Sequence, residues 1–203
     1  MVAFSKSPER LDSLINHASP MKGNMLKQLL MIFLAAHVSA HALKPEIGER
    51  PEPLTRLEYV DGTKFDIQNL RGKPAVIYFG ADWCGPCRVK GRPATERVAK
   101  KYGPLGLQVI FVSMDDNKFR QNKVEEARQL GLSIVMPSLE VCPPHKCPSG
   151  LRDLKEVYLY PTAFVLDAEG VLRAKMDHGQ GVQGGLEKAV VQVLKQSGVS
   201  IPP

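Results

Sequence analysis

Unbroken apolar runs mark the central strands that we expect in this chain. Residues 74–79 (PAVIYF) and 107–113 (LQVIFVS) are short and mostly apolar, a pattern typical of strands that are buried on both faces of a sheet. Two further strands are expected at residues 162–166 and 171–175, joined by a turn at 167–170 (DAEG). The runs predict a sheet whose central strands lie in the core.

Helical patterns alternate with these strands. Residues 88–102 have helical composition, residues 119–130 form an amphipathic pattern that ends at Gly131, and residues 185–196 close the chain as a helix. A short helix is also expected at residues 151–157. This order of elements predicts an α/β sheet covered on both faces, with parallel, right-handed first crossovers and an antiparallel last pair.

A hairpin is expected ahead of the first central strand. Two short runs flank Asp61 and Gly62, and this dipeptide favours a two-residue hairpin turn. The preceding residues, 43–53, are rich in proline and charge, which predicts an extended lead-in. The mature chain should therefore begin with a β-hairpin extension.

Residues 25–42 (MLKQLLMIFLAAHVSAHA) have the layout of a secretory signal peptide. Lys22 and Lys27 supply positive charge before an apolar stretch, and Ala40 and Ala42 supply the small residues of a cleavage site. The stretch is shorter than the roughly 20 residues of a membrane-spanning helix. A buried helix or an uncleaved anchor remains the alternative.

The chain is interpreted as a leader followed by one domain. Residues 1–20 are polar and unpatterned, so we expect translation to begin at Met21 or Met25, and residues 1–42 to be an N-terminal extension plus signal peptide, cleaved near Ala42. The remainder, 43–203, is one domain's worth of chain.

The composition and net charge of the chain argue against a nucleic-acid-binding function. The chain has 203 residues, of which 43% are hydrophobic and 24% charged, with a formal net charge of +6. Removal of the leader takes four basic and two acidic residues and leaves +4 on 161 residues. This charge is mild and forms no dense basic run, so a nucleic-acid partner is not expected.

Cys84 and Cys87 form the candidate reactive pair. They lie three residues apart at the expected start of a helix, where unpaired amides and the helix dipole favour a thiolate at the first sulfur. The second sulfur is one turn into the helix, within reach of a mixed disulfide on the first. Pro86 fixes φ where a missing amide costs little, and Gly85 leaves the approach to Cys84 uncrowded. The pattern predicts thiol–disulfide exchange.

The segment WCGPC at 83–87, preceded by FGAD at 79–82, resembles the active-site segment of the thioredoxin superfamily. The preceding hairpin, the segment 160–162 and the turn at 167–170 resemble its exported TlpA-like branch, which includes cytochrome-maturation thioredoxins. The likeness covers about residues 54–196. It implies a thioredoxin fold, with a central mixed sheet flanked by helices and an N-terminal β-hairpin extension.

The resemblance also implies roles for individual residues. Cys84 would be the nucleophile, Cys87 the resolving thiol, and Trp83 part of an apolar collar. Pro161 would follow a cis peptide bond and, with Tyr160, form a substrate-docking edge that faces the cysteines. A trans proline that begins a strand is the alternative. The expected substrate-binding set is Trp83, Gly85, Pro86, Tyr160 and Pro161.

Two departures from the family pattern concern proton transfer and the helix. Many thioredoxins carry a buried acid six residues before the first cysteine, but Tyr78 stands there in this chain and cannot act as a carboxylate base. Asp82 is nearer in sequence but is expected to point to solvent. The helix proline falls one residue later than usual, at Pro93. The residue that takes the proton of Cys87 is left open.

The second cysteine pair has three interpretations. Cys142 and Cys147 flank a proline-rich loop, and a structural disulfide between them is favoured in an exported protein. They could instead form a second exchange-active pair that relays electrons to or from Cys84, or bind a metal together with His145. His178, in the glycine-rich stretch HGQG, is interpreted as a surface residue in a turn.

These observations predict a monomeric periplasmic protein-disulfide reductase that needs no organic cofactor and no metal. The Gly-Pro dipeptide between the cysteines resembles that of reducing members of the superfamily, with potentials of about −270 mV, rather than that of oxidants, with potentials of about −120 mV. Such a reductant needs a membrane thiol-reducing electron donor, and its clients would be exported proteins such as apocytochromes. A disulfide-donating oxidase or isomerase and a non-catalytic metal-binding chaperone are the alternatives. The client, the donor and the direction of electron flow are not identified by the sequence.

Overall fold

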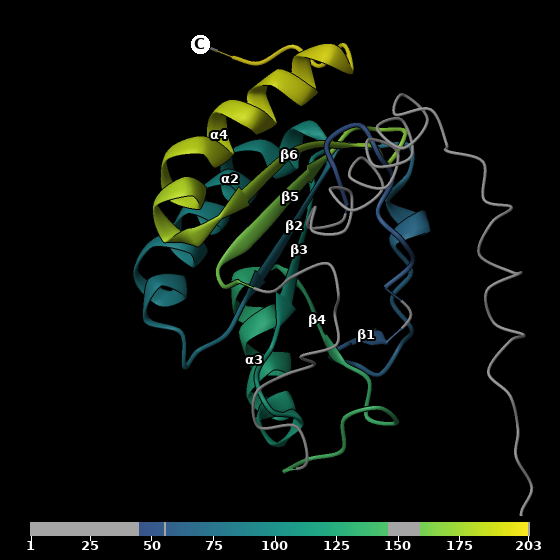
Figure 1. The fold of residues 1–203 in the computed structure, drawn as a ribbon, viewed down its shortest axis with the longest axis vertical. Helices are drawn as coiled ribbons and strands as arrows, with labels where there is room; N and C mark the ends of the chain where they lie inside the picture. The colour runs from purple at the N-terminus through teal and green to yellow at the C-terminus, as the bar shows by residue number, and fades with distance from the viewer. Residues whose placement is uncertain (1–44, 55, 146–158, 203) are drawn as a thin grey trace, which may run out of the picture. The chain divides into compact units, whose positions relative to one another are not determined.

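Six strands form one mixed sheet in the computed structural model, which describes residues 45–54, 56–145 and 159–202 (Figure 1). The strand order is β1-β4-β3-β2-β5-β6. The strands are β1 (Leu57–Tyr59), β2 (Ala75–Gly80), β3 (Gln108–Ser113), β4 (Ser133–Pro137), β5 (Thr162–Leu166) and β6 (Leu172–Asp177). β2, β3 and β4 run parallel, whereas β5 is antiparallel to both β2 and β6. The parallel first crossover and the antiparallel last pair are thus confirmed.

The apolar runs become the buried centre of the sheet. Every residue of β2 and β5 is buried, because both strands have neighbours on each side and covered faces. Side chains of β2 alternate between two cores: Ile77 and Phe79 enter one, and Val76 and Tyr78 enter the other. The predicted central strands are therefore confirmed within one or two residues of their ends.

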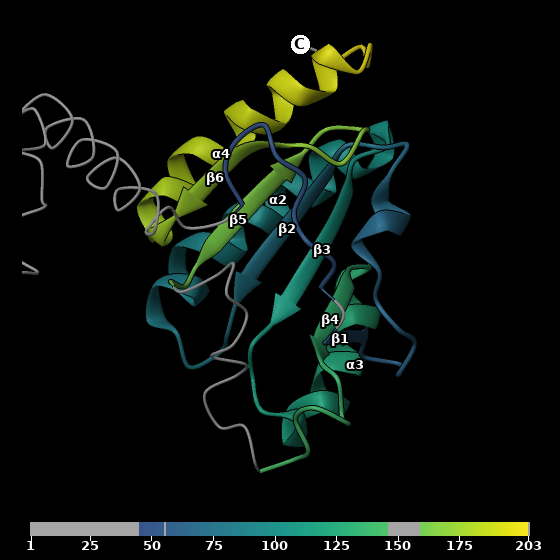
Figure 2. The same ribbon diagram turned by 45° about the vertical axis from the view of Figure 1, so that its right-hand side comes forward.

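Three α-helices are described: α2 (Arg92–Tyr102), α3 (Arg120–Leu130) and α4 (His178–Gln196). The shorter helical turns are η1 (Ile67–Leu70), η2 (Cys87–Gly91), η3 (Gly103–Leu105) and η4 (Asn117–Phe119). Helices α2 and α4 cover one face of the sheet, and the segment that contains η1 covers the other, as Figures 1 and 2 both show. Gly131 caps the C-terminus of α3, and its φ of +62° suits glycine.

The N-terminal hairpin is shorter than expected. The turn at Asp61-Gly62 forms, with the Tyr59 N–H donating to the Thr63 carbonyl at 2.7 Å. The returning arm consists of a single bridge between Glu58 and Lys64, because the chain then turns into η1. β1 instead pairs antiparallel with β4 at the edge of the sheet.

β4 is not among the strands predicted from the sequence. This strand has only three consecutive large apolar residues (Ile134, Val135 and Met136), begins at an exposed serine and ends at Pro137. Such a short run gives a weak strand signal, and pairing with β1 and β3 decides its conformation.

The prediction for the last helix is wrong at its start. The glycine-rich stretch interpreted as a turn belongs to α4, which begins at His178 rather than at Gly185. A Cβ built on Gly179 would lie 3.2 Å from the Cβ atoms of Pro86 and Lys90. The missing side chain thus allows α4 to pack closely on the active-site helix, and this tertiary contact outweighs the low helix propensity of glycine.

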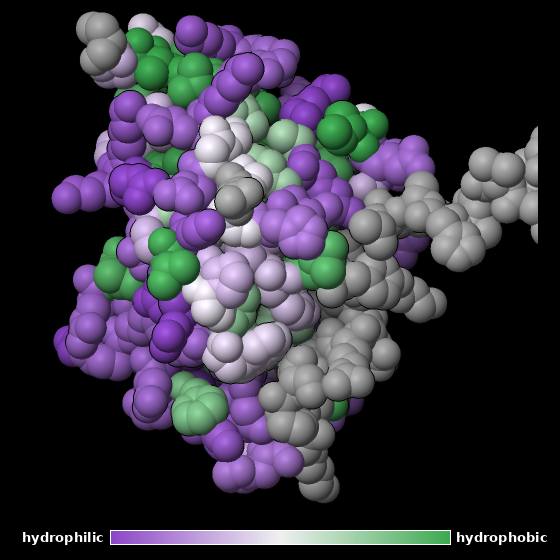
Figure 3. All heavy atoms as spheres, turned by 60° about the vertical axis from the view of Figure 1, so that its left-hand side comes forward, coloured by the Kyte–Doolittle hydropathy of each residue, from purple (hydrophilic) through white to green (hydrophobic). Residues whose placement is uncertain are grey.

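Several predictions concern residues outside the described ranges. These are the leader at 1–42, the short helix at 151–157 and Cys147. Among the described residues, no helix combines the length and apolarity needed to cross a membrane. On the face drawn in Figure 3, hydrophobic side chains form small groups separated by hydrophilic ones.

Candidate active site

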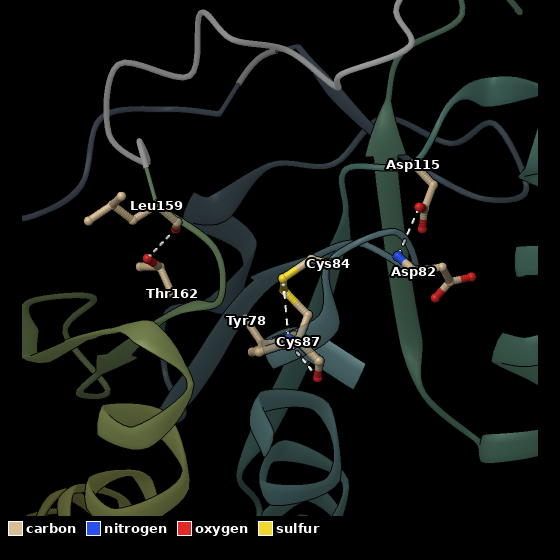
Figure 4. The surroundings of a disulfide bond; sticks show 7 residues. All are labelled: Tyr78, Asp82, Cys84, Cys87, Asp115, Leu159 and Thr162. Carbon is tan, nitrogen blue, oxygen red and sulfur yellow. Dashed lines mark hydrogen bonds between the residues drawn. A yellow bond between two sulfur atoms is a disulfide. The ribbon is translucent and has the colours of Figure 1, made fainter. Parts of the chain in front are cut away.

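Cys84 and Cys87 form a disulfide at the first turn of the helix that follows β2 (Figure 4). The Cys84 carbonyl accepts from the Arg88 N–H at 3.1 Å, and the Cys84 Sγ atom accepts from the Cys87 N–H at 3.2 Å. Cys84 therefore occupies an N-cap position, with its sulfur where the free amides of the first turn point. Once the disulfide is reduced, this environment favours a thiolate.

The two cysteines differ in their exposure to solvent. The exposed fraction of Cys84 is 7% and that of Cys87 is 2%. A Cβ placed on Gly85 would meet no atom within 4 Å, so the space beside Cys84 is open. The geometry supports approach of a reagent to Cys84 rather than to Cys87.

Pro161 follows a cis peptide bond, as expected. Its ring packs against Gly91, where an added Cβ would lie 2.8 Å from the Pro161 Cβ. Trp83 is exposed, and its ring lies edge-on to that of Tyr160, with centroids 6.0 Å apart. The expected substrate-binding aromatic residues thus lie together beside the disulfide.

Hydrogen bonds of Thr162 fix the end of the loop that carries Pro161. The Thr162 hydroxyl lies 2.6 Å from the Leu159 carbonyl oxygen and 2.9 Å from Oδ1 of Asp177, at the end of β6. Figure 4 shows this loop and the residues Asp82 and Asp115 on opposite sides of the disulfide.

The late position of Pro93 in the helix is explained by the π-helical turn that precedes it. η2 is a π-helical turn, closed by a bond from the Arg92 N–H to the Cys87 carbonyl. A π turn holds one residue more than an α turn. The extra residue between Cys87 and Pro93 is therefore absorbed in η2, and Gly91 at the end of this turn makes the close contact with Pro161.

Tyr78 points toward the resolving cysteine, and its hydroxyl donates to the Cys87 carbonyl at 3.3 Å. Burial raises the pKa of Tyr78 well above its ordinary value of 10, while the charges of Arg92 and Glu96 have smaller, opposing effects on that pKa. The phenol therefore stays protonated and acts as a hydrogen-bond donor rather than a base.

Asp82 lies largely in solvent, as expected, and forms ion pairs with Lys123 at 2.8 Å and Arg92 at 3.4 Å. Behind it lie two buried groups, Asp115 and Lys123, which were not predicted from the sequence. Asp115 accepts from the Asp82 N–H at 2.9 Å, and the Lys123 ammonium lies 3.3 Å from the Asp115 carboxylate. The position of Asp115 just after β3, which neighbours β2, was the available signal.

Cys142 is completely buried. The Asn117 side-chain amide donates to the carbonyl oxygens of Cys142 at 2.5 Å and Pro137 at 2.9 Å, which fixes the start of the second cysteine loop. No described cysteine is a free thiol. Because Cys147 lies outside the described residues, its pairing with Cys142 stays a prediction.

His145 has a local role in the same loop. Its backbone N–H donates to Oδ1 of Asp116 at 3.1 Å. Across the described ranges, no group of three or more histidine, cysteine, aspartate or glutamate side chains is arranged to hold a metal ion. His178 is exposed but lies in α4 rather than in a turn.

Known proteins resemble this chain in sequence. The AhpC/TSA family model matches residues 50–175. Thioredoxin-like protein slr1139 of Synechocystis is 44% identical over 81 residues, which cover 39% of this chain and 72% of that protein. "Probable nucleoredoxin 3" of Oryza sativa is 36% identical over 121 residues, 56% of this chain but only 23% of that protein. Thiol-disulfide oxidoreductase ResA of Bacillus subtilis is 22% identical over 149 residues, 73% of this chain and 78% of that protein.

The fold also matches solved structures. The thioredoxin domain of a thiol-disulfide oxidoreductase from Bacteroides vulgatus superposes with a TM-score of 0.55 at 19% identity, covering 72% of this chain and 99% of that chain. At this identity the likeness concerns the fold, which is thioredoxin-like as expected.

Proposed function

The chain belongs to the AhpC/TSA family of thioredoxin-like proteins, and on that premise we propose that it is an exported reductase of disulfides in other proteins. The broader assignment, a thiol–disulfide oxidoreductase with a Cys84–Cys87 pair, follows from its relatives and the disulfide. The observation that carries the proposal is the position of the Cys84 sulfur at the helix N-terminus, where it accepts from the Cys87 N–H.

The reaction begins when the Cys84 thiolate attacks a disulfide in a partner protein. The Cys84 sulfur forms a bond with one partner sulfur, and the other partner sulfur leaves with the electron pair and takes up a proton. Cys87 then loses its proton and attacks Cys84. The mixed disulfide breaks, the second partner thiol is released, and the Cys84–Cys87 disulfide remains.

The partner segment would dock on the surface around the disulfide. Trp83 and Leu159 expose apolar side chains there, and Tyr160 and Pro161 form the adjoining edge. Gly85 and Pro86 leave the first turn of the helix free of bulky side chains. This combination suits an extended peptide with a disulfide, which would contact both the aromatic residues and the loop.

Export and the reducing direction rest on sequence features. Residues 25–42 resemble a signal peptide, and Gly85-Pro86 resembles the dipeptide of reducing thioredoxins. In an oxidising compartment the Cys84–Cys87 disulfide must be reduced again. The proposal therefore includes a membrane thiol-reducing electron donor, and a monomer is the proposed working form.

Paired variants test the chemistry. Wild-type protein should reduce insulin in the presence of dithiothreitol, Cys84→Ser should not, and Cys87→Ser should accumulate a mixed disulfide with its client. Full turnover by Cys84→Ser contradicts the assigned nucleophile. A redox potential well above about −180 mV favours the oxidase or isomerase alternative, whereas tight binding of Cu(I) or Zn²⁺ without turnover favours the metal-binding chaperone.

A further inference from the structure

A small cavity lies directly behind the resolving cysteine. Its volume is about 30 Å³, and Cys87 and Tyr78 form part of its wall. The surface that faces this cavity is mostly apolar, but the volume is large enough for one water molecule. The titratable or charged groups that line it are Tyr78 on β2, Asp82 after it, Arg88 on η2, Arg92 on α2, Asp115 after β3, and Lys123 and Glu126 on α3.

Lys123 is the centre of the charged wall. Its side chain is only 4% exposed, and its ammonium lies 2.8 Å from Asp82, 3.0 Å from Glu126 and 3.3 Å from Asp115. Burial lowers the pKa of Lys123, but the hydrogen bonds to Asp82 and Glu126 and the charge of Asp115 outweigh this and raise it above its ordinary value. Lys123 therefore stays charged and cannot accept a proton.

Arg92 is the second cation of the wall. Its guanidinium pairs with Glu126, with Glu96 at 2.8 Å and with Asp82 at 3.4 Å. The two cations therefore face four carboxylates, and this ion-pair network has a formal excess of two negative charges. Arg88 also borders the cavity but is exposed. The capacity to accept a proton in this wall thus lies with the carboxylates.

Two of the four carboxylates line the cavity and are largely shielded from solvent, Asp115 buried and Glu126 partly buried. The side chains of Asp115 and Glu126 are 4% and 20% exposed and line it. Asp82 also lines it but is 56% exposed, and Glu96 does not line it. The candidate proton acceptors for Cys87 in this wall are therefore Asp115 and Glu126.

We propose that the carboxylates of Asp115 and Glu126 accept the proton of Cys87 across this cavity, through one bridging water. The proposal rests on the proposed function. The Cys87 S–H bond breaks, its proton passes through the water to the carboxylate pair, and the sulfur electron pair forms the bond to Cys84. The bond from Cys84 to the partner sulfur breaks, and the partner leaves as a thiolate. The pair takes the place of the acid that Tyr78 replaces.

The two carboxylates act as a unit, because they share Lys123 between them. When one is replaced by its amide, the formal negative excess of the network falls by one. The two cations then oppose the arrival of a proton at the remaining carboxylate more strongly. Either single replacement should therefore slow proton removal from Cys87.

A chromogenic disulfide separates the two steps in one trace. Reduced protein is mixed with an equimolar amount of dithiobis(nitrobenzoate), which releases one yellow thiolate when Cys84 attacks and a second when Cys87 resolves the mixed disulfide. Glu126→Gln and Asp115→Asn are the test variants. Glu125→Gln is the matched control, because Glu125 is the preceding residue of α3 and pairs with Arg128 on the exposed side of that helix.

In each test variant we expect the second release to slow by about 10-fold or more at neutral pH and to rise more steeply with pH, as hydroxide replaces the lost base. The first release and both releases of Glu125→Gln should match wild type. An unchanged or faster second release in folded Glu126→Gln overturns the proposal. Should that variant not fold, the same result in Asp115→Asn does so. Absence of the first release in wild type would instead refute the proposed function.

Discussion

Replacement of Gly91 by alanine tests how closely the active-site helix and the Pro161 loop are packed. The backbone at Gly91 has φ −65° and ψ −54°, which alanine adopts without strain. The obstacle is steric: the added Cβ would lie 2.7 Å from the Tyr78 hydroxyl oxygen and 2.8 Å from the Pro161 Cβ. Both groups are buried, so neither can move away without disturbing the core or the docking edge.

Two opposing effects set the change in the free energy of unfolding that we expect for Gly91→Ala. Alanine in place of glycine stabilises a helix by about 0.5–1 kcal/mol, and overpacking a buried site costs about 1–3 kcal/mol. Gly184→Ala isolates the first term, because Gly184 lies exposed in α4 and an added Cβ there meets nothing within 4 Å. We therefore expect Gly91→Ala to be about 1–3 kcal/mol less stable than Gly184→Ala.

Urea denaturation of both variants measures this difference, and insulin reduction reports on the loop. Gly91→Ala should also lose activity, since Pro161 must shift, while Gly184→Ala keeps it. Equal stabilisation by the two substitutions, with full activity in both, would refute the packing described for Gly91.

Two further predictions concern charged groups. Lys123→Met should lower the free energy of unfolding by about 3–5 kcal/mol, because it leaves carboxylates unpaired in the interior. Arg128→Met, at an exposed position, should lower it by less than about 1 kcal/mol. Urea denaturation measures both values, and similar losses for the two variants would contradict the buried network. Burial raises the pKa of Asp167, but hydrogen bonds from the Val171 N–H and Arg173 outweigh it and lower the pKa below the ordinary 3.8. Its carboxylate therefore stabilises the fold above that pH and loses this effect as pH falls through the lower folded-state pKa. Asp167→Asn should cost about 2 kcal/mol at neutral pH, with a difference from wild type that shrinks in acid; a constant difference across the range would be evidence against this carboxylate effect.

The central strands and the reactive pair could be predicted because their signals are local. The run at 74–79 has enough consecutive apolar residues to specify a buried strand, and the motif at 83–87 fixes the spacing of the two sulfurs. The cis bond before Pro161 came from resemblance, because a single proline does not determine its isomer. The structure contains this cis bond.

What the sequence did not reveal depends on contacts between distant segments. β4 is a strand because β1 and β3 pair with it, and α4 extends back to His178 because glycine at 179 allows close packing on Pro86. The charged wall behind Cys87 also depends on contacts between distant segments. Lys123 looks like a solvated helix residue in the sequence, and only the approach of α3 to the end of β3 buries it against Asp115.

The ionisation of Cys84 tests the account most directly. The reduced Cys87→Ser protein is titrated by thiolate absorbance, with the variant that lacks both cysteines as the blank. The sulfur's place at the helix N-terminus predicts that Cys84 becomes a thiolate well below the pH of about 8.5 at which an ordinary cysteine ionises. A Cys84 thiol that stays neutral beyond about pH 9 contradicts the proposed exchange chemistry.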